Sequence, residues 1–405
     1  MARRVVVTGI GVVSAIGIGK ESFGESLRDG RPGIAPLRSI PPGELKFPNG
    51  AEVADFDPDR YFDPKEAGFL DRFAQYGVVA AREAVSDAGL DWTPELKANA
   101  AVITGSALGG KATEDDGYRL LYAEKNTRFN PLTIPRAMAN AAASRISLEF
   151  GLTGAAYTIA TACSSSNHAI GQAFWAVRNG SADVALTGGS EAVFSRGLLH
   201  AWEAMRVVSP DTCRPFSKER RGLILGDGGA MLVIETLESA RARGAHIYAE
   251  IAGFGMSSDA HHITQPLAEG AARAMRAALI DAELAAERVD YINAHGTGTP
   301  ANDSTETTAI RSVFGTHADK LAVSSTKSMH GHTLGAAGAI EAAATLLGMA
   351  GGFIPPTANY CTPDPACDLD VVPNNSRAAS IGCALSNSFA FGGLNAVLAF
   401  RVPSL

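Results

Sequence analysis

Cysteine is scarce in this chain: five residues among 405, an odd number at irregular spacing. Such a set provides neither a disulfide framework nor a zinc-ligand pattern, so we expect no bound metal and a reducing cytoplasm as the setting. Charged residues are also few, at 19%, and the net charge is −7. A net negative chain argues against nucleic acid as the main partner.

Signals for export and for membrane insertion are missing as well. The start, Met-Ala-Arg-Arg-Val-Val-Val, passes straight into a strand pattern without an apolar signal-peptide core. The most membrane-like stretch, residues 334–354, is rich in Gly and Ala and contains Glu341. We therefore expect a packed core helix there and no membrane contact.

Apolar residues are plentiful, at 46%, and glycine occurs 43 times. The length suits two domains or one large duplicated one. The first apolar run, residues 4–14, contains Gly9 and Gly11, which suggest a dinucleotide fingerprint. Ser14 stands where that fingerprint needs its third glycine, so we do not expect a nucleotide site.

A weak internal repeat divides the chain. A predicted strand, a helix and a second strand occur in the first half, followed by a further strand and helix, and the same succession returns in the second half. We expect two α/β halves built alike, residues 1–245 and 246–405. The matched segments are 4–14, 71–90, 100–105 and 157–178 in the first half, and 248–256, 270–284, 289–294 and 321–350 in the second.

The stretch 157–171 is where we expect the chemistry. Its apolar start predicts a short buried strand, and residues 169–178 predict a buried helix closed by Gly180. Cys163 falls at the junction, beside backbone N–H groups and the positive end of a helix dipole. Both favour the thiolate, so we expect the thiol pKa to fall towards roughly 7, and the same N–H groups suit an oxyanion. A lone cysteine is more often structural, so this interpretation depends on partners elsewhere.

Three later motifs supply such partners. Asn-Ala-His295-Gly-Thr-Gly-Thr follows a predicted strand, at the end where α/β sheets place their ligands. Ser-Ser-Thr-Lys327-Ser-Met-His-Gly-His332 ends another strand. Asn-Ser-Phe-Ala-Phe391-Gly-Gly predicts a glycine-rich turn, which also fits a plain hairpin with core Phe. Taken alone, Lys327 would more often be a solvated charge.

Together with the Cys163 turn, these motifs in this order resemble the β-ketoacyl-acyl carrier protein synthases of the elongating, type II class. The resemblance covers essentially the whole chain. It implies the thiolase fold, an α/β fold of two duplicated α/β halves in five αβαβα layers, and a dimer. It also implies the reaction, a decarboxylative Claisen condensation of an acyl chain on the cysteine with malonyl-acyl carrier protein, which gives a 3-oxoacyl product.

The same resemblance implies roles for the motif residues. Cys163 would take the acyl chain from the carrier, and the backbone N–H groups of Cys163 and Phe391 would form its oxyanion hole. Phe391 would also act as a gate. His295 and His332 would hold the malonyl thioester carbonyl and stabilise the enolate that decarboxylation leaves.

Further residues would support the site and the carrier arm. Lys327, with Glu341 as its partner, would set the charge of the site and orient His332. Thr297 and Thr299 would contact the phosphopantetheine arm. Because that arm carries the substrates, the enzyme itself would need no bound cofactor.

Pocket and docking positions are implied in the same way. Leu108 and Thr133 match positions that line the acyl tunnel, and Thr133 stands where a larger Phe is common, which suggests a specialised or polyenoyl chain. Lys65 keeps one basic residue of the usual docking loop for the carrier protein, and Arg206 is a second candidate contact.

Two departures from the housekeeping pattern resemble nodulation-type synthases and those of polyene-making type II polyketide systems. His330 stands where Thr is usual, and Cys163 is followed by Ser-Ser-Ser-Asn-His. The segment 261–266, His-His-Ile-Thr-Gln-Pro, adds to this likeness. Primary fatty acid and specialised polyketide or polyene synthesis both stay open, as does the role of His330.

Alternative functions within the fold can be weighed on single residues. A thiolase would carry a second cysteine in the Phe391 turn, whereas Cys383 only precedes it. A non-catalytic chain-length partner would lack the nucleophile. A homodimer and a heterodimer with a chain-length factor both remain compatible with the sequence.

Overall fold

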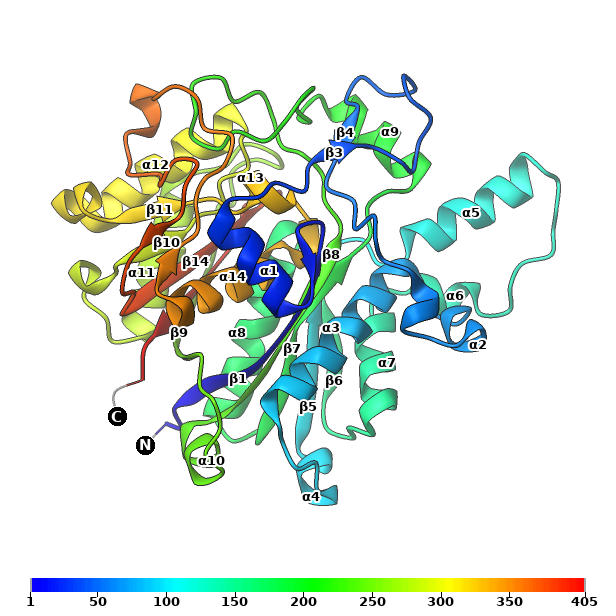
Figure 1. The fold of residues 1–405 in the computed structure, drawn as a ribbon, viewed down its shortest axis with the longest axis horizontal. Helices are drawn as coiled ribbons and strands as arrows, with labels where there is room; N and C mark the ends of the chain where they lie inside the picture. The colour runs from blue at the N-terminus through cyan, green and yellow to red at the C-terminus, as the bar shows by residue number, and fades with distance from the viewer. Residues whose placement is uncertain (1, 404–405) are drawn as a thin grey trace.

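The computed structural model describes residues 2–403, which form a layered α/β molecule (Figure 1). In the first half, the strands are β1 (Val5–Ser14), β2 (Gly17–Ile18), β3 (Ala35–Pro36), β4 (Asn49–Gly50), β5 (Ala100–Gly105), β6 (Ala156–Ile159), β7 (Val184–Glu191) and β8 (Gly228–Thr236). The helices there are α1 (Lys20–Asp29), α2 (Pro64–Ala67), α3 (Arg72–Ala88), α4 (Pro94–Ala98), α5 (Lys111–Tyr122), α6 (Thr133–Ala137), α7 (Ala141–Phe150), α8 (Ser165–Arg178), α9 (Arg196–Met205) and α10 (Leu237–Ala242).

The second half repeats the pattern with fewer helices. Its strands are β9 (Ala249–Ser258), β10 (Tyr291–Asn293), β11 (Ala322–Ser324), β12 (Phe353–Ile354), β13 (Arg377–Ala378), β14 (Cys383–Ala390) and β15 (Leu394–Arg401). Its helices are α11 (Ala268–Asp281), α12 (Pro300–Phe314), α13 (Lys327–His330) and α14 (Ala337–Gly351). In Figure 1 its yellow-to-red elements lie at the left, beside the blue-to-green first half.

The strand order demonstrates the duplication. The first half runs β1-β8-β7-β5-β6 and the second β9-β15-β14-β10-β11, so corresponding strands hold corresponding places. The directions match too: β5 lies parallel to β6 and β7, as β10 does to β11 and β14, and the remaining pairs are antiparallel. Antiparallel pairing of β1 with β9 joins the two sets into one sheet within the described residues. The predicted boundary at 245/246 falls in the loop between α10 and β9.

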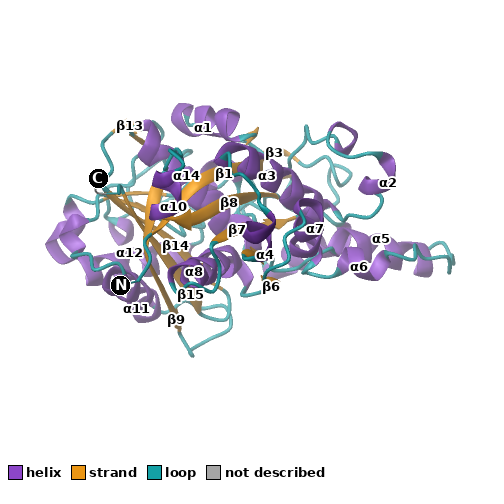
Figure 2. Cartoon of the chain, turned by 90° about the horizontal axis from the view of Figure 1, so that it is seen from below, coloured by secondary structure: helices purple, strands orange, loops and turns teal. Residues whose placement is uncertain are grey.

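The two sets of strands form two layers of the molecule, and helices form the other three. In Figure 2 the strands lie towards the middle, with helices around them. Helix α3 packs on β1, β8 and β7 on one outer face, and α11 packs on β9 and β15 on the other. Helices α8 and α14 contact each other and strands of both halves, which makes them the central layer. This arrangement confirms the predicted αβαβα fold.

Buried helices explain the apolar stretch near residue 340. The segment Leu334–Gly351 is long and apolar enough to cross a membrane, but 83% of it is buried inside the protein. It contains α14, whose residues are apolar on all sides because the helix is covered on all sides. The predicted core helix is thus confirmed.

Local signals in the sequence account for the ends of α3 and for its packing on β1. Asp71 caps α3 by accepting the N–H of Phe73, and Gly89 ends the helix in the left-handed conformation at φ 58°. Gly11 lets α3 pack closely on β1, because a Cβ at position 11 would lie 2.0 Å from the carbonyl oxygen of Ala80 on α3. The glycines of β1 therefore allow close approach of a helix rather than of a nucleotide.

One predicted strand is less buried than the sequence suggested. The strand before Cys163, β6, is largely exposed, and Tyr157 keeps 41% of its surface. The reason is position: β6 ends the sheet and pairs only with β5 among the described strands. Its apolar residues were expected inside the core but form an open edge of this single chain.

Candidate active site

The Cys163 turn, the two histidine loops and the Phe391 turn meet at one pocket of about 240 Å³. Its walls come from seven separate segments of the chain, which a single stretch of sequence cannot reveal. The lining residues are Cys163, Trp202, Met205, Val207, Leu223, His262, Ile263, Thr264, Gln265, Pro266, His295, Thr297, Thr299, Ala301, Asn302, His332, Phe389, Ala390, Phe391 and Gly393.

Cys163 sits on a strained turn between β6 and α8. Ala162 has φ +52°, a left-handed conformation that costs a non-glycine residue about 1–3 kcal/mol. Hydroxyl groups hold the turn: Ser164 Oγ donates to the carbonyl of Thr161 at 2.9 Å, and Ser165 Oγ donates to that of Ala162 at 2.6 Å. The serines that follow the cysteine thus fix its place at the helix start.

The environment of the thiol corrects one prediction. Burial raises the pKa of Cys163 to about 11, although Lys327 and the backbone N–H groups of Phe391 and Cys163 act to lower it. Glu191, also buried, raises the thiol pKa further. The expected fall towards 7 is wrong because desolvation outweighs the favourable contacts. The two N–H groups nevertheless face the sulfur, as an oxyanion hole requires.

His295 is held by a carboxylate that the sequence analysis missed. Glu306 on α12 accepts the backbone N–H groups of His295 and Gly296, both at 2.8 Å. Asn387 Nδ2 donates to the same carboxylate at 3.2 Å. In the sequence Glu306 is an acidic residue nearly two turns into the helix that follows the Gly-Thr-Gly-Thr loop, and no local signal distinguishes it.

Lys327 lies fully buried in an ion pair with Glu341. Its Nζ is also 3.4 Å from His295 Nδ1, so the ammonium group contacts His295 and not His332, which corrects the predicted partner. Because an ammonium only donates, His295 Nδ1 accepts and its Nε2 carries the proton. Burial raises the pKa of Glu341 to about 7, and Lys327 acts to lower it.

His332 faces His295 across the pocket, with ring centroids 5.4 Å apart at 85°. Its backbone N–H donates to the carbonyl of Ile224 at 2.6 Å. Burial lowers the pKa of both imidazoles well below 6.5, and Lys327 lowers them further. Both rings are therefore neutral at neutral pH and can present N–H donors.

Phe391 occupies the turn between β14 and β15, so the plain hairpin and the site motif are the same structure. Its ring lies 6.4 Å from that of Trp202, across the pocket. Gly392 and Gly393 have φ of 84° and 71°, which only glycine adopts readily. The N–H of Gly392 donates to Ile263, which joins this turn to the 261–266 loop.

The remaining predicted residues divide into two groups. Thr297 and Thr299 line the pocket, with hydroxyl oxygens 2.9 Å apart. Leu108 packs in the apolar cluster that contains Cys163. Thr133 does not line this pocket, and its hydroxyl donates to the carbonyl of Asn130 instead.

The two docking candidates are both exposed but lie on different elements. Arg206 caps α9 between Met205 and Val207, which line the pocket, so it flanks the mouth. Lys65 lies on α2 and is not part of the pocket wall. The structure therefore brings only Arg206 close to the site within one chain.

Two other features bear on binding. Among residues 2–403, no group of three or more His, Cys, Asp and Glu side chains could hold a metal ion.

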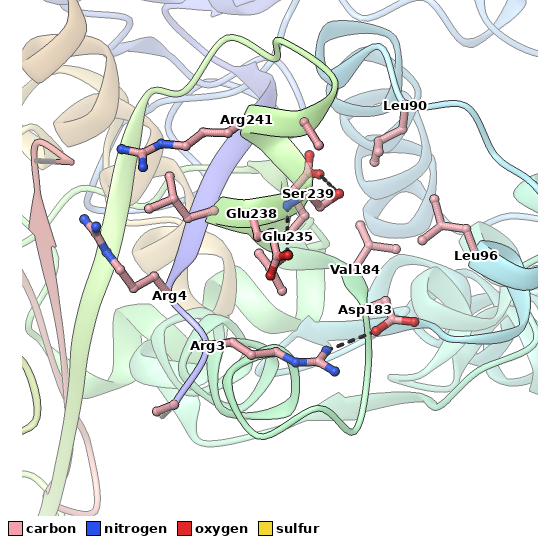
Figure 3. Close-up of a pocket in the computed structure, with 14 residues that line it drawn as sticks. Arg3, Arg4, Leu90, Leu96, Asp183, Val184, Glu235, Glu238, Ser239 and Arg241 are labelled. Carbon is pink, nitrogen blue, oxygen red and sulfur yellow. Dashed lines mark hydrogen bonds and ion pairs between the residues drawn. The ribbon is translucent and has the colours of Figure 1, made fainter. Parts of the chain in front are cut away.

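A wide groove near the N-terminus is lined by mixed charges (Figure 3), but Asp183 pairs with Arg3 at 3.1 Å and Glu235 with Arg243 at 2.6 Å. Two of its carboxylates, Asp183 and Glu235, are already paired with arginines, so we assign no ligand to it.

Comparisons with known proteins agree with this geometry. Residues 2–240 match the model for the N-terminal domain of beta-ketoacyl synthase, and residues 248–361 match that for its C-terminal domain. The chain is 48% identical to nodulation protein E of Rhizobium sp. (strain N33) over 401 residues, covering 99% of this chain and all of the relative.

The chain is also similar to a synthase of a second organism and to a solved structure. The chain is 43% identical to 3-oxoacyl-[acyl-carrier-protein] synthase 2 of Synechocystis sp. over 408 residues, covering 98% of each chain. The solved structure of the ishigamide ketosynthase/chain length factor contains a chain that superimposes with a TM-score of 0.95 at 40% identity, covering all of both chains.

Proposed function

The chain belongs to the β-ketoacyl synthase family, and from this premise we propose which residues carry out its condensation and which chains it extends. As a condensing enzyme, it joins an acyl group to the two carbons of a malonyl thioester with loss of carbon dioxide. The observation that carries the residue assignment is the pocket in which one thiol, two N–H donors and two neutral imidazoles converge.

In the first step Cys163 takes the acyl chain. Its sulfur attacks the thioester carbonyl of the acyl-carrier protein while the N–H groups of Cys163 and Phe391 hold the oxyanion. The carbon–sulfur bond to the pantetheine breaks, and the proton of the Cys163 thiol passes to the departing pantetheine sulfur. Splitting the condensation at this acyl-enzyme stage replaces one difficult step by two easier ones.

In the second step the malonyl thioester carbonyl lies between His295 and His332. As carbon dioxide leaves, the electron pair of the broken carbon–carbon bond forms an enolate, and the two neutral imidazoles donate hydrogen bonds to its oxygen. Lys327 supplies a fixed positive charge beside His295, 3.4 Å away. The α-carbon then attacks the carbonyl of the acyl thioester, and the carbon–sulfur bond to Cys163 breaks. The Cys163 thiolate that leaves takes up one proton from solvent, which regenerates the thiol.

The substrates arrive on an acyl carrier protein, as the name of the Synechocystis relative states for that enzyme. We infer that the phosphopantetheine arm passes Thr297 and Thr299 and that Arg206 contacts the carrier at the mouth. No cofactor of the enzyme's own takes part, and a cytoplasmic location suits soluble carrier-bound substrates.

The chain extended is a specialised acyl or polyenoyl chain. Support comes from the similarity to nodulation protein E and to the ishigamide ketosynthase. The latter is described with a chain length factor, so a heterodimer with such a subunit is the alternative to a homodimer.

The face that would join the two subunits is open in the single chain. Strand β6 ends the sheet and carries Tyr157, which is 41% exposed. Exposed apolar side chains also lie on α6 and α7, with Ile134 at 70% and Leu148 at 76%. An exposed strand edge with apolar flanks is a template for pairing with another chain. We place the dimer interface there.

The decisive experiment incubates the purified enzyme with acyl- and malonyl-carrier protein and follows both proteins by mass spectrometry. The proposed function predicts an acyl adduct on Cys163 and a 3-oxoacyl product on the carrier. A product formed without the adduct would contradict the nucleophile assignment. No product with a range of acyl chains would contradict the substrate class.

A further inference from the structure

His330 is a buried histidine inside the active-site turn to which the condensation assigns no step. It is the last residue of α13, three residues after Lys327 and two before His332, and none of its surface is exposed. Its ring has two hydrogen-bond partners: Nδ1 lies 2.9 Å from the carbonyl oxygen of Gly331, and Nε2 lies 3.0 Å from Thr326 Oγ1.

These partners fix the protonation of the ring. A carbonyl oxygen can only accept, so Nδ1 carries the hydrogen, and Nε2 must then accept from the Thr326 hydroxyl. Burial and, to a smaller extent, the charge of Lys327 lower the pKa of His330 to about 3. The neutral ring with this tautomer is therefore the state present at neutral pH.

The hydrogen bonds continue beyond the turn. Asn293 Nδ2 donates to Thr326 Oγ1 at 3.5 Å, and it also donates to the backbone carbonyl of Glu341 at 3.2 Å. Asn293 ends β10, two residues before His295, and Thr326 directly precedes Lys327. A chain from His330 through Thr326 to Asn293 thus connects the turn that carries Lys327 to the strand that carries His295.

We propose that His330 is a positioning residue for decarboxylation, which acts by holding Thr326, and with it Lys327, at a fixed distance from His295. This inference rests on the proposed function, because only decarboxylation uses the His295–Lys327 contact. Acyl transfer to Cys163 uses the N–H groups of Cys163 and Phe391, and no residue of the hydrogen-bond chain contacts them. His330 should therefore affect one half of the reaction and spare the other.

Two variants separate the bonds of the ring. His330→Asn keeps a donor near the Nδ1 position but removes the acceptor for Thr326, whereas His330→Gln keeps an acceptor near the Nε2 position. We expect His330→Asn to slow malonyl-carrier decarboxylation about fivefold to tenfold, the effect of one buried hydrogen bond. His330→Gln should retain most of the rate, and acylation of Cys163, measured by intact mass, should stay within about twofold in both.

Thr326→Val provides an independent variant, since it removes the hydroxyl and keeps the shape of the side chain. It should slow decarboxylation at least as much as His330→Asn does, because it also removes the acceptor for Asn293 Nδ2. The double variant should be no slower than Thr326→Val alone, because both changes break the bond between His330 and Thr326. His317→Gln is the matched control: its Nε2 lies 2.9 Å from the carbonyl of Val289, outside the pocket. It should leave both half-reactions unchanged.

The outcomes separate a failure of the proposed function from a failure of the role assigned to His330. A parent enzyme that does not decarboxylate malonyl-carrier protein would overturn the proposed function, and this role with it. A parent that does, with His330→Asn decarboxylating at the parent rate, would overturn only the role of His330. Equal losses of acylation and decarboxylation in His330→Asn, or full additivity with Thr326→Val, would make the residue merely structural and would also overturn the inference.

Discussion

Cys163 carries a thiol that is protonated in the resting enzyme, since burial raises its pKa to about 11. Its reactivity therefore arises when a thioester carbonyl enters the oxyanion hole and the proton has a departing sulfur to move to. A depressed pKa would instead give a thiolate that is present before any substrate binds.

This difference predicts the pH dependence of alkylation. Iodoacetamide reacts with the thiolate, so its rate at Cys163 should keep rising through pH 9 and 10, because the thiol is still mostly protonated there. Intact-mass measurement of the alkylated enzyme at each pH gives the rate. The Cys163→Ala variant corrects for the other cysteines, and a plateau near pH 7 would refute the raised pKa.

The two histidines should act on the second half-reaction only. His295→Ala and His332→Ala each remove a neutral N–H donor from the developing enolate, and loss of such a donor costs about 10²–10³ in rate. We expect malonyl-carrier decarboxylation to fall by that order while Cys163 still takes the acyl chain. Loss of the acyl adduct with decarboxylation retained would reverse the assigned roles.

Residues of the site were predictable to different degrees. Cys163, His295, Lys327 and His332 lie in short motifs at strand ends, and the motifs taken together, through the family they resemble, indicate these residues where no single motif does. Glu306 lies inside an ordinary helix, and its role appears only when that helix packs behind the His295 loop. The pKa of Cys163 was not predictable either, because desolvation depends on what covers the thiol.

At the scale of elements, Glu191 joins the loop 106–109 to the second half of the molecule. Glu191 accepts the N–H groups of Ala107, Leu108 and Gly335, at 2.6, 3.2 and 3.1 Å. The same carboxylate therefore holds the loop that carries Leu108 and the start of the central helix. A fixed loop would give the proposed acyl tunnel a fixed wall.

Leu108→Phe should shorten the longest product. The larger ring on this fixed loop fills space beyond the Cys163 thioester, and one methylene in an apolar pocket already changes binding by about 1–3 kcal/mol. We expect a shifted chain-length distribution, measured by mass spectrometry of the carrier-bound products. Leu108→Met, of similar volume, is the control, and an unchanged distribution in Leu108→Phe would mean that the chain does not pass this residue.

The elements of the internal repeat were predicted because each of them has a local signal. The 3.6-residue pattern and the caps Asp71 and Gly89 define α3, and the paired order of strand and helix revealed the duplication. The burial of β6 was predicted wrongly because its apolar residues look the same in a core and at an open edge. Only the order of strands in the sheet distinguishes the two.

At the scale of the whole molecule, the open β6 edge predicts the oligomer. Leu148→Glu places a charge on the face proposed for the dimer and should raise the dissociation constant at least about tenfold, since burying an unpaired charge is costly. Ile280→Glu is the matched control: Ile280 is 77% exposed, against 76% for Leu148, but lies on the outer helix α11. Light scattering after size exclusion measures the mass of both variants and of the parent over a range of concentrations. Equal masses for Leu148→Glu and the parent at all concentrations would exclude this interface.

The buried histidines predict how the stability of the molecule depends on pH. The folded state lowers the pKa of His330 from 6.5 to about 3, so the unfolded chain binds its proton first as the pH falls. The free energy of unfolding should therefore decrease as the pH drops below 6.5, by about 2 kcal/mol at pH 5 from this residue alone. Urea unfolding of the parent and His330→Gln between pH 5 and 7 measures the difference, and parallel curves would contradict it.

One measurement tests the central claim most directly: the mass of the intact enzyme and of its carrier after sequential addition of acyl- and malonyl-carrier protein. The account predicts that the parent gains one acyl group, loses it when malonyl-carrier protein is added, and leaves a 3-oxoacyl group on the carrier. Cys163→Ala should gain no acyl group and give no 3-oxoacyl product. A 3-oxoacyl product from Cys163→Ala at the parent rate would contradict the claim that this thiol carries the growing chain.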